Sequence, residues 1–147
     1  MKYLLDASAL LPLTTKRGKQ LITDATKQTL LTTDLAIYET SNVLWKLATL
    51  LKTITQQDAT NTITLIEEIT AKNLIQPTSY QELDLQSTLQ KAHSERITFY
   101  VASYITAAEQ TEATLVTEDE KLQKASTKSV KTISYTELEH LLDTRQQ

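Results

Sequence analysis

The sequence predicts an α/β protein, a three-layer sandwich in which helices cover both faces of a mostly parallel, short-stranded sheet. Short apolar segments alternate with helical ones along the 147 residues. Parallel neighbours need crossover connections, and these are normally helices, so the alternation favours a parallel sheet. No repeat, linker or shift in composition divides the chain, and we therefore expect one domain over residues 1–147.

Five short apolar segments are the predicted strands. The first ends in a carboxylate, Asp6, and the third is stopped by Pro77. The first two lack the alternation of apolar and polar residues that a half-buried strand shows, which favours a buried position. The five segments are residues 2–6, 30–33, 74–77, 113–117 and 130–133.

Two long helices are predicted between the second and third strands from apolar residues at helical spacing. The first runs from Asp34, as its N-cap, to about Lys52, and the second follows at once and ends near Asn73. The apolar face of the first is expected to contain Leu35, Tyr38, Val43, Leu47, Leu50 and Leu51. The stripe of the second is expected to contain Ala59, Ile63, Ile66 and Thr70.

Two capping boxes predict further helix starts. Ser79 with Glu82 is expected to open a helix that runs to about His93, and Ser134 with Glu137 is expected to open the terminal helix. A short helix is also expected after the acidic cluster 118–120. The alternation of strands and helices is thus maintained to the end of the chain.

The composition excludes several classes of site. There is no cysteine, so disulfides, thiolate zinc sites and cysteine nucleophiles are excluded, and a reducing, cytoplasmic location is expected. The only glycine, Gly18, cannot build a glycine-rich nucleotide loop. No window approaches about 18 uninterrupted apolar residues, so we expect no membrane association.

The net charge of −3 argues against a broadly basic nucleic-acid-binding surface. Any such contact must be local. Runs of charge are usually solvated faces, so these clusters alone do not establish a binding site. The local candidates are Lys16, Arg17 and Lys19 near the start, and Lys121, Lys124, Lys128 and Lys131 later.

Three carboxylates stand out by their positions. Asp6 closes the first strand and Asp119 closely follows the fourth, so a parallel sheet would bring both to the edge where ligands bind. Glu39 lies inside an otherwise apolar helical stretch. Each also has a structural explanation, because Asp6 and Asp119 suit helix N-termini and Glu39 suits a solvent-facing helix surface.

Considered together, the three acids suggest a metal site. Carboxylates at about 5 Å spacing repel by about 3 kcal/mol per pair at an effective dielectric near 20, and a divalent cation would relieve this repulsion. Oxygen ligands without cysteine favour Mg²⁺ or Mn²⁺ over zinc. Such ions typically activate water against phosphodiesters.

Three segments resemble the PIN-domain nucleases, and among them the toxin subunits of VapBC toxin–antitoxin systems. They are residues 3–8 (YLLDAS), 35–46 (LAIYETSNVLWK) and 115–122 (LVTEDEKL), and the resemblance covers nearly the whole chain. It implies a PIN-like α/β/α fold and a metal-dependent endoribonuclease, a hydrolase that cleaves RNA with metal-activated water. It also implies a homodimer inhibited by a small VapB-like antitoxin.

The resemblance further implies the site residues. Asp6, Glu39 and Asp119 would bind Mg²⁺ or Mn²⁺, while Ser8 and Thr117 would orient ligands or water. For Thr117 there is an alternative, because residues 117–120 also match a capping box.

The chain departs from the family pattern at Val101, where the segment 99–104 (FYVASY) usually carries a third acidic residue of the pocket. Val101 also fits the apolar stripe of a helix over 97–110, with Ile97, Tyr104, Ile105 and Ala108. Three hypotheses follow: a working ribonuclease with weakened activity, a degenerate PIN domain that binds RNA or antitoxin without cleavage, and an unrelated α/β scaffold whose acids are ordinary caps.

Overall fold

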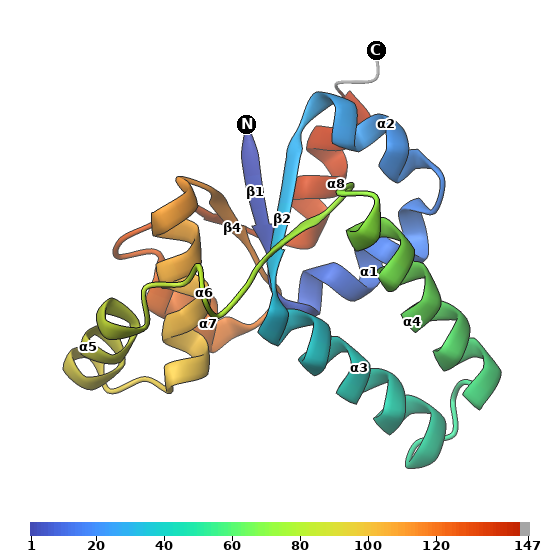
Figure 1. Cartoon of the computed structure of the whole chain (residues 1–147), viewed down its shortest axis with the longest axis horizontal. Coiled ribbons are helices and arrows are strands. Elements are labelled where there is room, and N and C mark those ends of the chain that lie inside the picture. The colour runs from blue at the N-terminus through green and yellow to red at the C-terminus, as the bar shows by residue number, and fades with distance from the viewer. Residues whose placement is uncertain (145–147) are drawn as a thin grey trace.

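The computed structural model describes residues 1–144 and contains a five-stranded sheet in the order β3-β2-β1-β4-β5 (Figure 1). All four strand pairs are parallel, as predicted. The strands are β1 (Lys2–Leu5), β2 (Thr29–Thr33), β3 (Gln76–Thr78), β4 (Thr114–Val116) and β5 (Thr132–Ile133). We expected one domain over residues 1–147, and residues 145–147 lie outside the residues that the structure describes.

Helices occupy both sides of this sheet. In Figure 1, α5 and α6 lie on one side, and α1, α4 and α8 lie on the other. Within residues 1–144, no helix has both the length and the apolar character needed to span a membrane. The helices are α1 (Ala7–Arg17), α2 (Gln20–Lys27), α3 (Asp34–Thr49), α4 (Gln56–Ala71), α5 (Leu85–Glu95), α6 (Phe99–Thr111), α7 (Glu120–Ser126) and α8 (Tyr135–Thr144).

Strand β1 is the centre of the core. Leu4 and Leu5 are fully buried, and β1 pairs with β2 on one side and β4 on the other. A strand covered by helices on both faces must be apolar at consecutive positions. This explains why the strands showed short apolar runs instead of alternation.

The predicted apolar face of α3 is wrong. Its buried residues are Ala36, Thr40 and Leu44, at a spacing of four, whereas Tyr38 is 77% exposed and Val43 is also exposed. Helix α3 contacts α1 and α4. The small side chains of the buried face allow this close approach, and the larger apolar side chains are left outside. The N-cap is Thr33, one residue before the predicted Asp34.

The helix predicted after Ser79 begins later than expected. Ser79 and Glu82 do form the reciprocal bonds of a capping box, with Glu82 N donating to Ser79 Oγ at 3.3 Å. They close only a turn, and α5 starts at Leu85 with Asp84 as its N-cap. The second predicted box is confirmed, since Ser134 and Glu137 form both bonds at the start of α8.

A buried ion pair joins three helices on one side of the sheet. Arg17 at the end of α1 binds Asp24 of α2 through two nitrogens, at 2.9 and 2.8 Å, and Asp143 of α8 at 2.6 Å. The Arg17 and Asp24 side chains are only 3% and 1% exposed. Arg17, considered above as a nucleic-acid contact, is therefore a structural residue.

Replacing Arg17 with Ala should destabilise the fold by about 3–5 kcal/mol, because it leaves the buried Asp24 carboxylate without its guanidinium. Urea unfolding measures this loss. The double variant Arg17→Met/Asp24→Leu removes both charges and should recover much of it. A single variant as stable as the parent would show that the pair contributes nothing to folding.

Candidate functional site

The carboxyl ends of the three central strands meet at one edge of the sheet. Leu5 is paired with Val116, and the backbone N–H of Asp6 donates to the Val116 carbonyl at 3.2 Å. On the other side, the Thr32 hydroxyl donates to the Leu5 carbonyl at 2.8 Å. The residues that follow β1, β2 and β4 are therefore brought to the same edge, as the parallel topology predicted.

Asp6 is held at this edge by three donors. Its Oδ1 accepts from the Ser8 hydroxyl at 2.6 Å and from the Ala9 N–H at 3.1 Å, and its Oδ2 accepts from the Thr117 hydroxyl. Asp6 is thus the N-cap of α1, but a cap needs only the bond to Ala9. The two hydroxyls fix the carboxylate further, although it is only 4% exposed.

The same hydroxyls continue the network to α7. Ser8 Oγ accepts from the Glu118 N–H at 2.8 Å, and Thr117 Oγ1 accepts from the Asp119 N–H at 3.0 Å. Asp119 in turn caps α7 by accepting from Leu122 N at 2.9 Å. Asp119 is therefore the cap of this helix, and Thr117 instead links Asp6 to the α7 entrance.

Glu39 interacts electrostatically with Asp6 and Asp119. It lies half-buried on α3, and burial followed by the negative charge of Asp6 raises its pKa, with a further contribution from Asp119. The pKa of Asp6 is also raised, first by burial and then by Asp119, against the opposing effect of its hydrogen bonds. The three predicted acids therefore influence one another electrostatically.

Tyr104 is a site residue that sequence reasoning treated only as core. It is 4% exposed, and its buried hydroxyl lies close to the Glu39 carboxyl, whose pKa is lowered by this interaction. Burial and the charges of Glu39 and Asp6 raise its pKa, so this hydroxyl stays protonated beside the acids. A tyrosine on a buried helix needs a partner for its O–H, and that requirement was the available signal.

The candidate donors at this edge are carboxylate oxygens, the ligand type of a hard divalent cation. Mg²⁺ is usually bound by one or two carboxylates, with water and substrate phosphates as the remaining ligands, and Asp6 and Glu39 would be that pair. The buried Tyr104 hydroxyl adds a polar group beside Glu39. Within residues 1–144, no three Asp, Glu or His side chains form a ready-made cluster for a metal ion.

Val101 lies apart from this network. It is half-buried on α6, packs against the core with Ile97, and lines a separate hollow together with Lys121 and Lys124. The predicted stripe is thus partly correct, since Tyr104, Ile105 and Ala108 are buried while Ile97 and Val101 are at its margin.

The free energy of unfolding of the Asp6→Asn variant, relative to that of the parent, should increase as the pH rises. A group with a raised folded-state pKa contributes stability that is complete below its unfolded pKa and lost as pH rises through the folded pKa. Urea unfolding in EDTA at about pH 3.5 and about pH 7 should therefore give a variant-minus-parent difference that is more positive at the higher pH.

Asp84→Asn is the matched control with the opposite sign. Hydrogen bonds from Ser87 hold the pKa of Asp84 below its usual range, so its stabilisation is present at neutral pH and is lost in acid. Its variant-minus-parent difference should become more negative from acid to neutral pH. Equal pH dependence in both variants would contradict the assigned environments.

No protein-family model and no curated protein matches the sequence. Among solved structures, the chain is similar to PAE2754 from Pyrobaculum aerophilum, with a TM-score of 0.75, 27% identity, and 98% of this chain and 96% of that chain covered. It is also similar to VapBC-1 from nontypeable Haemophilus influenzae, with a TM-score of 0.52, 17% identity, and 92% and 99% covered.

A third similar structure is VapBC2 from Rickettsia felis, bound to a DNA fragment from its promoter. Its TM-score is 0.55, with 13% identity, and 91% of this chain and 98% of that chain are covered. These likenesses extend along nearly the whole chain, so the hypothesis of an unrelated α/β scaffold does not hold. The chain has the PIN-like α/β/α fold that the sequence resemblance implied, the fold of VapC toxins.

Proposed function

We propose that the chain is a Mg²⁺- or Mn²⁺-dependent endoribonuclease, the toxin component of a toxin–antitoxin pair. The observation that carries the proposal is the buried Asp6, whose two oxygens are oriented by hydroxyls within reach of the charges of Glu39 and Asp119. The similarity to solved VapBC complexes supports the toxin assignment.

The cation would be held by Asp6 and Glu39, with Asp119 adding negative charge. When bound, it would polarise a phosphoryl oxygen and lower the pKa of a coordinated water. Ser8 and Thr117 orient the Asp6 carboxylate by donating to different oxygens. The Tyr104 hydroxyl stays protonated and can donate to Glu39 or to a substrate oxygen. Without a cation, the three acids repel a phosphodiester.

Purified protein should cleave a mixed RNA pool when Mn²⁺ or Mg²⁺ is added, and Asp6→Asn or Glu39→Gln should each lower the rate by at least about 100-fold. Loss of a metal ligand should cost at least as much as the roughly 10–100-fold seen for groups that only support ligands. The rate is measured on denaturing gels with the metal concentration varied.

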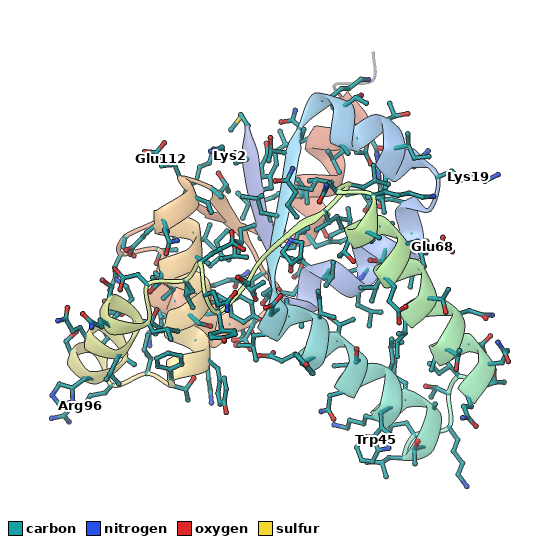
Figure 2. The ribbon with its side chains drawn as sticks, viewed as in Figure 1. Lys2, Lys19, Trp45, Glu68, Arg96 and Glu112 are labelled. Carbon is teal, nitrogen blue, oxygen red and sulfur yellow. The ribbon has the colours of Figure 1, made fainter. Side chains whose placement is uncertain are left out.

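Glu68→Gln is the matched control, because Glu68 is exposed on α4, away from the sheet edge (Figure 2). It should cleave like the parent, which excludes a general effect of removing a carboxylate. Cleavage that survives Asp6→Asn would indicate a contaminating nuclease. Absence of cleavage by the parent would support the alternative, a degenerate PIN domain that binds RNA or antitoxin without cutting, and Val101 would be its first explanation.

We also propose a protein partner for an exposed aromatic strip between α3 and α6. The strip consists of Leu35, Tyr38, Tyr80, Phe99 and Tyr100. It lines two adjoining hollows that share Leu35 and Tyr100. Tyr38, Tyr80 and Tyr100 are 77%, 66% and 63% exposed, and exposed apolar patches of this kind mark interaction sites. A small VapB-like antitoxin is the proposed occupant.

A homodimer is proposed at a different face. The end of α3 and the residues after it expose Trp45, Leu50 and Leu51, which offers a second apolar surface that the antitoxin strip does not include. The two associations can therefore be separated by mutation.

Light scattering tests both associations. The chain alone should have twice its own mass, and co-expression with a small VapB-like antitoxin should give a heavier complex. Tyr38→Ser/Tyr100→Ser should lose the partner and stay dimeric, while Trp45→Ser should give monomers that still bind the partner. A monomeric parent, or loss of both associations in each variant, would contradict the assignment of the two surfaces.

A further inference from the structure

A basic hollow lies beside the acidic site, at the junction of α5, α6 and α7. Its volume is about 370 Å³, and four cationic side chains line it without any acidic one. These cations, called here the basic hollow residues, are Arg96, Lys121, Lys124 and Lys128. Its remaining wall is formed by Ile97, Thr98, Val101 and Ala125.

The four cations are free to bind a ligand. None of them forms an ion pair with any residue in the described part of the chain, 1–144. Lys121 and Lys124 lie on one face of α7, at the spacing i and i+3, and Lys128 lies in the turn after the helix and lines the same hollow. Arg96, in a left-handed conformation after α5, adds the fourth charge.

The apolar wall makes this hollow different from an ordinary solvated run of charge. Val101 and Ile97 pack against the core at its base, so the cations surround a defined concave surface. A cation group of this kind suits phosphate oxygens, since lysine and arginine bind them by charge and hydrogen bonds. The structural alternative, an ion pair with a neighbouring carboxylate, is absent for these four cations within residues 1–144.

The hollow and the acidic site share two helices. Helix α6 carries Val101 into the hollow and Tyr104, one turn later, to the acids. Asp119 is the N-cap of α7, and Lys121 lies in the first turn of this helix. A chain with repeating phosphates could therefore place one phosphate near the acids and the next ones over the basic hollow.

We infer that the basic hollow binds the phosphodiester backbone of single-stranded RNA beside the acidic site. This inference rests on the proposed function, because it assigns the path of the substrate strand. A strand crossing the start of α6 also meets the exposed rings of Phe99 and Tyr100, on which unpaired bases can stack. Single-stranded RNA offers both the backbone charge and the free bases.

The test measures binding without cleavage. A fluorescent single-stranded RNA of about 12 nucleotides is titrated in EDTA, and anisotropy gives the affinity at several salt concentrations. Because single-stranded binding loses about 0.7 in salt slope per phosphate contact, Lys121→Gln/Lys124→Gln should lower the slope by about 1.4 and the affinity by roughly 25-fold at about 0.1 M salt.

The matched control is Lys2→Gln/Lys19→Gln, which removes the same charge at the other end of the strands. Lys2 begins β1, and Figure 2 shows Lys2 at the top and Lys19 at the upper right of the view, both away from Arg96 at the lower left. This pair should leave the slope unchanged. An equal loss in the control would overturn the inference, because the effect would then be one of net charge alone.

Val101 provides a second, independent variant. Val101→Asp places a carboxylate in the wall of the hollow and should weaken RNA binding in EDTA. Val101→Asn introduces a side chain of the same shape as Asp without the charge and should bind like the parent. Inorganic phosphate at constant ionic strength should not displace the RNA, and displacement would instead indicate a pocket for small anions.

Binding and cleavage separate this inference from the proposed function. RNA binding that depends on Lys121 and Lys124, in a protein that does not cleave, would sustain the basic hollow while the nuclease proposal failed. Cleavage without any effect of these lysines on binding, or no detectable binding by the parent at low salt, would overturn the inference.

Discussion

The buried carboxylate of Asp6 is the constraint on which the functional edge of this protein depends. Asp6 directly follows β1 and caps α1. It also accepts a hydrogen bond from the hydroxyl of Thr117, which follows β4. Burying a charge is costly unless hydrogen bonds replace its water, and three donors supply that replacement here. The same bonds therefore join two neighbouring strand ends, fix the direction of the carboxylate and keep it in a desolvated place.

The acidic group at this edge lowers the stability of the fold at neutral pH. Burial and like charge raise the pKa values of both Asp6 and Glu39, so an ionised pair costs free energy at neutral pH. The Arg17 pair, by contrast, is satisfied on both sides and stabilises the packing of α1 against α2 and α8. Carboxyl groups whose pKa values are raised by burial and by each other's charge are typical of functional sites.

Local sequence rules predicted the order of the strands and the parallel class because buried strands need continuous apolar residues, as in β1. The predicted stop of the third strand at Pro77 is wrong, because Pro77 lies inside the edge strand β3 (Gln76–Thr78), where a missing N–H is tolerated. The same rules failed for the buried face of α3, because tertiary contacts selected the small residues Ala36 and Thr40 over the larger Tyr38. The caps were ambiguous for a different reason. Asp6 and Asp119 cap helices and also belong to the acidic group, so the structural and functional explanations were never exclusive. Tyr104 could not be assigned, since its role depends on what lies opposite its hydroxyl.

The distribution of charge would explain how a chain of net charge −3 accepts the RNA strand proposed above. The acids at the ends of β1 and β4 repel a single phosphate, while the basic hollow residues attract it, and α6 and α7 hold the two regions side by side. A small anion can occupy only the basic hollow and gains nothing from the acidic edge. Under the proposed function, a strand with repeating phosphates would occupy both once a cation neutralised the acids. The proposed arrangement would therefore favour a polymer over a mononucleotide without any base-specific contact, and Val101, as an uncharged part of the wall, adds no negative charge to the hollow.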